Sequence, residues 1–446
     1  MRHGSLIQGF ALAGLVSGNA IAASVSVSPS SVVHLTPVEF NPANQIEAVI
    51  NSVATASSIF AVGWTDHDRN QAWSFNIARD TSLAWKINYN SGRLERPYIV
   101  GSTLDGGYWA AGVAFTRDVS KEIQGNPHGW DLLKTVEYEY VRRFDHNGHT
   151  SDTVKISPIG NDHFFDCGLE LPSGYVFAGW GPAGDKYKGT LSPWIEMVDK
   201  TGKRLWDRTF VEQQNRLLIK DLTMGTQNGC GGLHVTPDGK LTWVTKVLTN
   251  QLIETPQGRQ AVHSPRSNGF WGIFLVQLDA LGNEINRSFR QELKFPTLLK
   301  HGEGFVLLEY PVHQDQHPPP DAVVPDIVGF QPKIDYGLKA EFLDPSLHET
   351  RSWSYKPDDR SSHVETAVET PEGGWLLGTC ESANGPSTLM YLNSMGVLSA
   401  RVSIDFDKSQ ACDRLAIIQG VNKGEAVVLA FNERSGVRTM IAKYAD

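Results

Sequence analysis

The sequence predicts an all-β fold in which about seven copies of one four-stranded unit close into a propeller. Three observations predict this fold: a hairpin-based repeat recurs along the chain, glycines mark its turns, and the two chain ends hold complementary parts of one unit. Apolar residues make up 40% of the 446 residues, which excludes a disordered chain. The 42 Gly and 23 Pro residues favour short strands joined by turns over long helices.

The repeat is visible when two distant segments are compared. Residues 171–206 and 372–398 both read as an apolar strand A, a glycine turn, an apolar strand B, a variable loop, a strand C, an Asp/Asn-x-x-Gly turn and a strand D. Glycine supplies a positive φ, and Asp or Asn accepts hydrogen bonds from the following amides, so both turns join hairpins. The A/B turn recurs at Gly106, Gly174, Gly239, Gly304, Gly373 and Gly424, and the C/D turn at 145–148, 199–202, 279–282, 393–396 and, without glycine, 344–347.

Counting a degenerate first unit gives seven blades. The period of about 50 to 70 residues is longer than the typical propeller blade, and the excess lies between strands B and C. The predicted blades span residues 50–90, 99–158, 164–211, 228–290, 295–356, 362–406 and 411–446.

The last unit predicts how the ring closes. It supplies strands A, B and C and then the chain stops, so strand D is missing. Residues 31–40 form a spare strand before the first A/B pair and are expected to complete blade seven, which would leave no unpaired blade edge. An open array and a pair of β-sandwiches are the alternatives.

The N-terminus predicts export. Residues 1–22 combine an early arginine, an apolar run at 6–16 and small residues before a cleavage site after Ala22, as a secretory signal peptide does. We expect residues 23–446 to form one propeller domain in the periplasm or outside the cell. A membrane anchor is the alternative, but the apolar run is too short to span a bilayer, and no later segment is long enough.

Charge and cysteines narrow the possible partners. The net charge of -9 and the lack of a Lys/Arg cluster argue against nucleic acid. The four cysteines lack the Cys-x-x-Cys spacing of zinc sites, so disulfides are favoured in an exported chain.

In a propeller the start of strand A, the end of strand B and the start of strand C meet on one face, here called the top face. All four cysteines fall there in neighbouring blades, which predicts the bridges Cys167–Cys230 and Cys380–Cys412.

Three short segments carry a resemblance to a known group of proteins. They are Asp-Gly-Gly-Tyr-Trp at 105–109, Lys-Arg-Leu-Trp at 203–206 and Leu-Val-Gln-Leu-Asp-Ala-Leu-Gly at 275–282. With these segments the chain resembles bacterial β-propeller repeat proteins. The resemblance implies the fold more than a function, because such repeats occur in carriers, scaffolds and enzymes. Residues 236–243 resemble the Asp-box of sialidases, but the glycine is shifted by one residue.

The candidate binding residues lie on the top face, where the long B-to-C loops 116–132, 248–269 and 311–333 also lie. They are Trp64, Asp66, His67, His163, Asp166, Trp180, His313 and His317. Tryptophan is enriched in binding hot spots, although packing between blades is the simpler explanation of Trp64 and Trp180. The histidines and carboxylates read as solvated loop residues, since a Pro-rich loop does not fix metal geometry, and we expect neither a metal nor a cofactor.

The sequence favours a binding role over catalysis. No Gly-x-Ser-x-Gly elbow, phosphate-binding loop or His-Glu-x-x-His helix is present, so no catalytic residue is predicted. The leading hypothesis is a protein that grips a protein partner with its top-face loops, in one version as an inhibitor or immunity protein. The alternatives are an enzyme, either a glycan hydrolase or lyase or a quinone-dependent dehydrogenase, and an envelope scaffold. The oligomeric state is left open.

Overall fold

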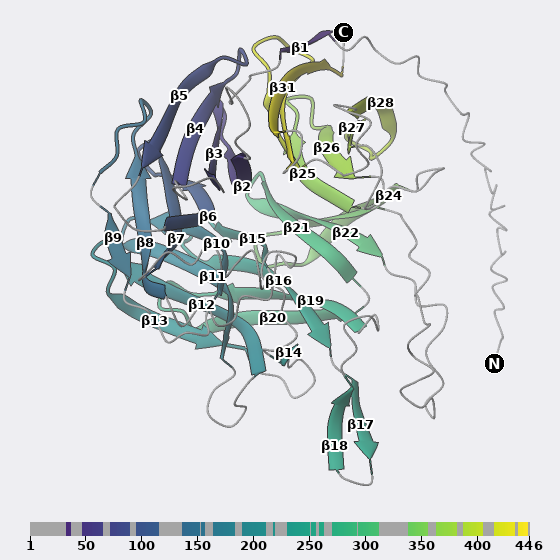
Figure 1. Cartoon of the computed structure of the whole chain (residues 1–446). Helices are drawn as coiled ribbons and strands as arrows, with labels where there is room; N and C mark the ends of the chain where they lie inside the picture. Colours follow the sequence, from purple (N-terminus) through teal and green to yellow (C-terminus); the bar gives the residue numbers. More distant parts are fainter. Residues whose placement is uncertain are drawn as a thin grey trace, which may run out of the picture.

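The fold is described from a computed structural model. It describes residues 33–36, 47–65, 72–89, 95–115, 136–151, 153–156, 164–182, 190–210, 217–218, 230–249, 251–255, 258–262, 270–291, 293–311, 338–355, 363–380, 387–404, 414–432 and 436–444. Every regular element in these residues is a β-strand. The strands form seven antiparallel blades, which are arranged in a ring, and one separate hairpin, which projects from the ring (Figure 1).

The first three blades follow the predicted order from the inner strand A to the outer strand D. Blade 1 consists of β2 (Glu47–Ala54), β3 (Ser58–Thr65), β4 (Ala72–Ala78) and β5 (Leu83–Tyr89). Blade 2 consists of β6 (Glu95–Ser102), β7 (Tyr108–Phe115), β8 (Val136–Phe144) and β9 (Val154–Ile156). Blade 3 consists of β10 (Phe164–Leu171), β11 (Gly174–Pro182), β12 (Thr190–Asp199) and β13 (Arg204–Thr209), and β14 (Leu217–Leu218) also pairs with β12.

Blades 4 to 6 repeat this order. Blade 4 consists of β15 (Cys230–Val235), β16 (Leu241–Thr249), β19 (Phe270–Leu278) and β20 (Glu284–Gln291). Blade 5 consists of β21 (Leu293–His301), β22 (Gly304–Pro311), β23 (Leu338–Leu343) and β24 (Glu349–Tyr355). Blade 6 consists of β25 (His363–Glu369), β26 (Trp375–Cys380), β27 (Ser387–Leu392) and β28 (Leu398–Ile404).

Blade 7 is built from both ends of the chain, as the sequence predicts. It takes β29 (Arg414–Gln419), β30 (Glu425–Asn432) and β31 (Gly436–Lys443) from the C-terminal part, and β1 (Val33–Thr36) adds the outer strand. The strands β1 and β31 are antiparallel, with Val33 opposite Ile441 and Thr36 opposite Thr439 (Figure 1). The chain is therefore a seven-bladed propeller closed by an N-terminal strand.

The hydrophobic core is divided into layers between blades. Seven clusters of buried side chains occur among the described residues, and each joins two adjacent blades. The cluster that joins blades 7 and 1 packs Trp73 and Ile59 against Ile418 and Leu429. Both faces of every blade are thus covered, which explains the nearly continuous apolar runs of the B and C strands.

The C/D turns have the structure that their sequence predicts. In blade 3, Asp199 Oδ1 accepts hydrogen bonds from the amides of Thr201 (2.8 Å) and Lys203 (3.0 Å). The equivalent Asp145, Asp279, Asp344 and Asn393 accept the same pair of bonds. Three of these turns also lock neighbouring blades together, because their glycines lie against Trp85, Trp206 or Trp353 of the preceding blade. A Cβ atom at Gly282 would lie 2.6 Å from Cδ2 of Trp206.

The A/B turns correct part of the sequence analysis. Gly106, Gly239, Gly373 and Gly424 have positive φ as expected, but Gly174 and Gly304 do not. These two glycines begin strand B, and a Cβ atom on either would collide with the carbonyl oxygen of Val198 or Leu343 on strand C. Their role is close approach of two backbones, a need that the sequence pattern does not distinguish from positive φ.

Candidate functional site

Of the predicted binding residues, only Trp64, Asp166 and Trp180 lie within the described part of the chain. Trp64 is on β3, between Ala48 and Ala72 of its neighbours. The other five lie outside the described residues and remain predictions: Asp66, His67, His163, His313 and His317.

Trp180 lies near the top end of β11, but its side chain is buried. Only 4% of it is exposed, and its Nε1 has no hydrogen-bond partner. Such burial favours a packing role over stacking on a ligand at the face. Its environment matches the alternative of packing between blades.

Asp166 lies at a repeated irregularity of the inner strands. It is half-buried and is the extra residue of a β-bulge between Phe165 and Cys167 of β10. Five other inner strands also shift register near the top face, at 49–51, 97–99, 230–232, 294–297 and 364–366. A bulge re-aims the extra side chain, and bulges are common beside functional sites. The sequence does not reveal them, because they carry no shared residue.

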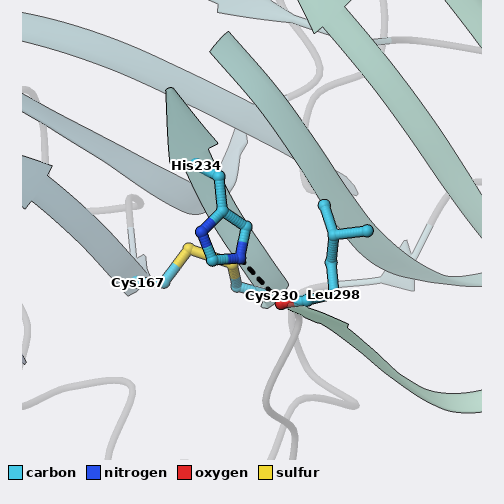
Figure 2. Close-up of a disulfide and its surroundings, with 4 residues drawn as sticks. All are labelled: Cys167, Cys230, His234 and Leu298. Carbon is cyan, nitrogen blue, oxygen red and sulfur yellow. Dashed lines mark hydrogen bonds between the residues drawn. A yellow bond between two sulfur atoms is a disulfide. The ribbon is translucent and has the colours of Figure 1, made fainter. Parts of the chain in front are cut away.

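The disulfide between blades 3 and 4 is the one predicted contact on the top face that the structure describes in full. Cys167 on β10 and Cys230 on β15 are bonded, with their Cα atoms 5.9 Å apart (Figure 2). Beside it, His234 Nε2 donates a hydrogen bond of 2.7 Å to the carbonyl oxygen of Leu298 in blade 5. Burial lowers the pKa of His234, so the imidazole is neutral at physiological pH. Cys380 ends β26, but Cys412 lies outside the described residues, so the second bridge stays a prediction.

The predicted loop 248–269 is wrong in part. Strand β16 continues to Thr249, and a separate hairpin follows, made of β17 (Gln251–Thr255) and β18 (Gly258–Val262). It projects away from the sheet of blade 4 and pairs with no strand of any blade (Figure 1). Since β16 ends and β19 begins on the top face, the hairpin is an outgrowth of that face.

Two buried carboxyl groups between blades 2 and 3 were not predicted. Glu139 on β8 is 7% exposed and Glu196 on β12 is 0% exposed. Burial raises the pKa of Glu139 well above its ordinary value, and the nearby Glu196 raises it further. Burial also raises the pKa of Glu196 to about 8, against the opposing effect of Arg204. A protonated carboxyl group can act as a general acid, but these two are too enclosed for a substrate to reach.

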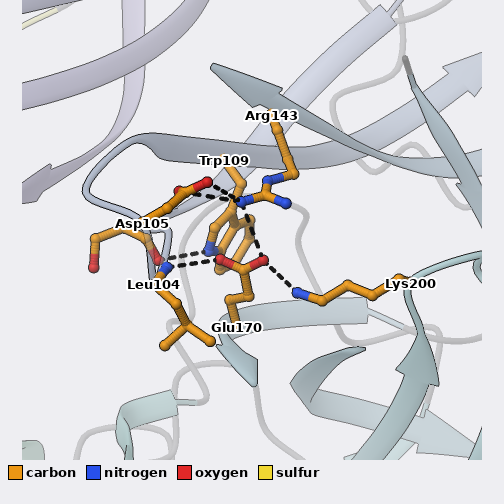
Figure 3. A network of polar contacts seen from close by, with 7 residues as sticks. Leu104, Asp105, Trp109, Arg143, Glu170 and Lys200 are labelled. Carbon is orange, nitrogen blue, oxygen red and sulfur yellow. Dashed lines mark hydrogen bonds and ion pairs between the residues drawn. The ribbon is translucent and has the colours of Figure 1, made fainter. Parts of the chain in front are cut away.

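A second polar cluster ties the same two blades on the opposite, bottom face. Glu170 of β10 accepts a hydrogen bond of 3.0 Å from the amide of Leu104 and forms ion pairs with Arg143 (3.5 Å) and Lys200 (Figure 3). Arg143 also pairs with Asp105 at 3.1 Å. These contacts hold blades 2 and 3 together.

The described residues contain no group of three or more His, Cys, Asp or Glu side chains placed to hold a metal ion. Within the same part of the chain, no helix is long and apolar enough to cross a membrane. The features that distinguish the top face are therefore its hairpin, its disulfide and its bulged inner strands.

Comparisons with known proteins give only distant similarities. No protein-family model matches the chain, and no curated protein is similar to it. Among solved structures, it is similar to a puromycin-hydrolyzing peptidase of Mycobacterium tuberculosis, with 10% identity, a TM-score of 0.47 and coverage of 90% of this chain and 55% of the other. The β-propeller domain of the Trilobed protease from Pyrococcus furiosus gives 10% identity, a TM-score of 0.44 and coverage of 90% and 98%.

A quinohemoprotein alcohol dehydrogenase from Pseudomonas putida HK5 is more distant, with 9% identity, a TM-score of 0.39 and coverage of 88% of this chain and 73% of the other. The chain spans about half the length of the two puromycin-hydrolysing enzymes it matches. At such low identity and overlap, these proteins lend this chain no activity, substrate or partner.

Proposed function

We propose that this chain is an exported propeller that binds a protein partner through its top face, with the β17–β18 hairpin as a principal contact. The observation that carries the proposal is the hairpin itself. It projects from a blade whose other connections are short turns, and both of its strands have one edge without a strand partner (Figure 1). An exposed strand edge offers backbone donors and acceptors to a partner.

The scaffold beneath the hairpin supports a binding role. The disulfide Cys167–Cys230 joins blade 4, which carries the hairpin, to blade 3, and His234 joins it to blade 5. A rigid base lowers the entropy lost on binding, which favours tight complexes. An inhibitor or immunity protein needs such a surface and no catalytic group, and this is the version of the proposal that we favour.

The test compares two variants for capture of a partner from an extract of the bacterial envelope. In the first, a Gly-Ser linker of equal length replaces residues 251–262. In the second, Leu104→Ser and Met395→Ser remove exposed apolar side chains from turns on the bottom face. We expect the first variant to lose at least about tenfold in affinity and the second to bind like the native chain.

The reverse pattern would contradict the proposal, and so would a native chain that captures no stoichiometric partner. In that case turnover of a polysaccharide panel or of quinone-linked alcohol substrates would favour an enzyme, and neither binding nor turnover would favour a scaffold.

A further inference from the structure

The carboxyl groups of Glu139 and Glu196 face each other across the contact between blades 2 and 3. Side chains alternate along a strand, so Glu196 shares a face of β12 with Trp194 and Val198, and Glu139 shares a face of β8 with Val141. All three of these apolar neighbours belong to the core cluster that joins the two blades. Oε2 of Glu139 and both carboxyl oxygens of Glu196 are buried and have no hydrogen-bond partner among the described residues.

One described cation, Arg204, acts on both carboxyl groups of this pair. Arg204 on β13 approaches Glu196 with 3.3 Å between Nε and Oε2, but it also pairs with Asp207 at 3.8 Å and is 35% exposed. On the inner side, Tyr98 of β6 packs against the same core cluster, and Asp166 of β10 is close enough to act on the Tyr98 hydroxyl electrostatically. The other described cations at this interface do not lower the pKa of either carboxyl group. Arg96 lies on the same face of blade 2, in register with Val113 and Glu139, and Arg143 and Lys200 pair with Asp105 and Glu170 at the bottom of the interface.

We infer that the contact between blades 2 and 3 is a pH-dependent latch, which is closed while Glu139 and Glu196 hold their protons and loosens when both ionise. Two like charges in a dry interface repel each other and lose their hydration, so ionisation favours a state in which water reaches them. The inference concerns the scaffold and does not depend on a partner.

The direction of the pH dependence follows from the raised pKa values. In the opened or unfolded chain a Glu titrates near its ordinary pKa of 4.5, whereas the closed interface raises the pKa of Glu196 to about 8. The closed state thus holds more protons than the opened state. The protonated carboxyl groups therefore stabilise the closed interface fully below about pH 4.5, and this stabilisation is lost as the pH rises through the pKa of about 8 that Glu196 has in the closed interface. Between these limits the opening constant rises about tenfold per pH unit for each proton released.

Blade 5 provides a matched control. Glu341 lies opposite Leu307, just as Glu196 lies opposite Phe177, and is likewise buried at 4% exposure. It forms an ion pair with Lys339 on its own strand, so its charge is compensated. Glu341→Gln removes a buried carboxyl at the same place in a blade without touching the latch.

The experiment is hydrogen exchange of the full chain from pH 6 to pH 8, corrected for the intrinsic pH dependence of exchange. In the native chain and in Glu341→Gln, the opening constant of peptides from β8 and β12 should rise at least tenfold per pH unit, while peptides from β23 and β27 change less. In the double variant Glu139→Gln and Glu196→Gln, β8 and β12 should lose this pH dependence.

A native chain whose β8 and β12 open equally at pH 6 and pH 8 would overturn the inference, as would a double variant that keeps the native slope. If the double variant does not fold, the single variant Glu139→Gln tests the inference. It should remove about one proton from the slope, and an unchanged slope would reject the latch.

Discussion

At the residue scale, the glycines of the repeat have two different structural roles, a positive φ and close approach of two backbones. Gly239 adopts a φ of 82° in an open turn, where a Cβ atom would meet nothing within 4 Å. Gly174 has an ordinary φ but lies directly against the carbonyl oxygen of Val198. Both were read from the sequence as positive-φ turns, because a pattern shows that a side chain is excluded but not what excludes it.

This difference predicts unequal costs for one substitution. Gly174→Ala forces two strands of blade 3 apart and should lower the free energy of unfolding by about 3 kcal/mol, the upper range for overpacking. Gly239→Ala only strains the backbone and should cost about 1 kcal/mol. Denaturant titration of both variants measures the difference, and equal losses would refute the assignment of the two roles.

At the element scale, short strands were predictable where turn residues bound them. The repeated Gly and Asp/Asn positions locate both turns of a blade, and the missing outer strand of the last unit points to β1 (Val33–Thr36). The hairpin at 251–262 lies in a segment that the sequence predicts as loop, although Pro256-Gln257-Gly258 is a turn signal. The bulges and the contact between Glu139 and Glu196 could not be predicted from the sequence, because both depend on the register between strands.

The closing strand β1 is predicted to stabilise the whole ring. Removing residues 23–40 exposes the edge of β31, whereas removing residues 23–30 leaves β1 intact. We expect the longer truncation to lower the melting temperature by roughly 5 °C or more and to promote association through the open edge. Calorimetry and light scattering provide the readouts, and equal behaviour of the two truncations would show that β1 does not close the ring.

At the scale of the whole molecule, the repeated four-stranded unit predicts the fold but does not predict the function. Among the described residues, seven interblade clusters and one disulfide hold the ring together, and these were largely predictable from apolar runs and cysteine positions. The site was less predictable, since Trp180 is buried and the hairpin carries no signature residue. The two faces of this propeller differ. The turns on the bottom face are regular, and the β17–β18 hairpin projects from the top face.

The most direct test of a top-face binding site is hydrogen exchange of the chain with and without its captured partner. We predict that protection on binding concentrates in residues 251–262 and in the neighbouring top-face ends of β16 and β19, while the A/B and C/D turns exchange as in the unbound chain. Protection centred on turns such as 103–107 or 393–397, with the hairpin unchanged, would contradict it.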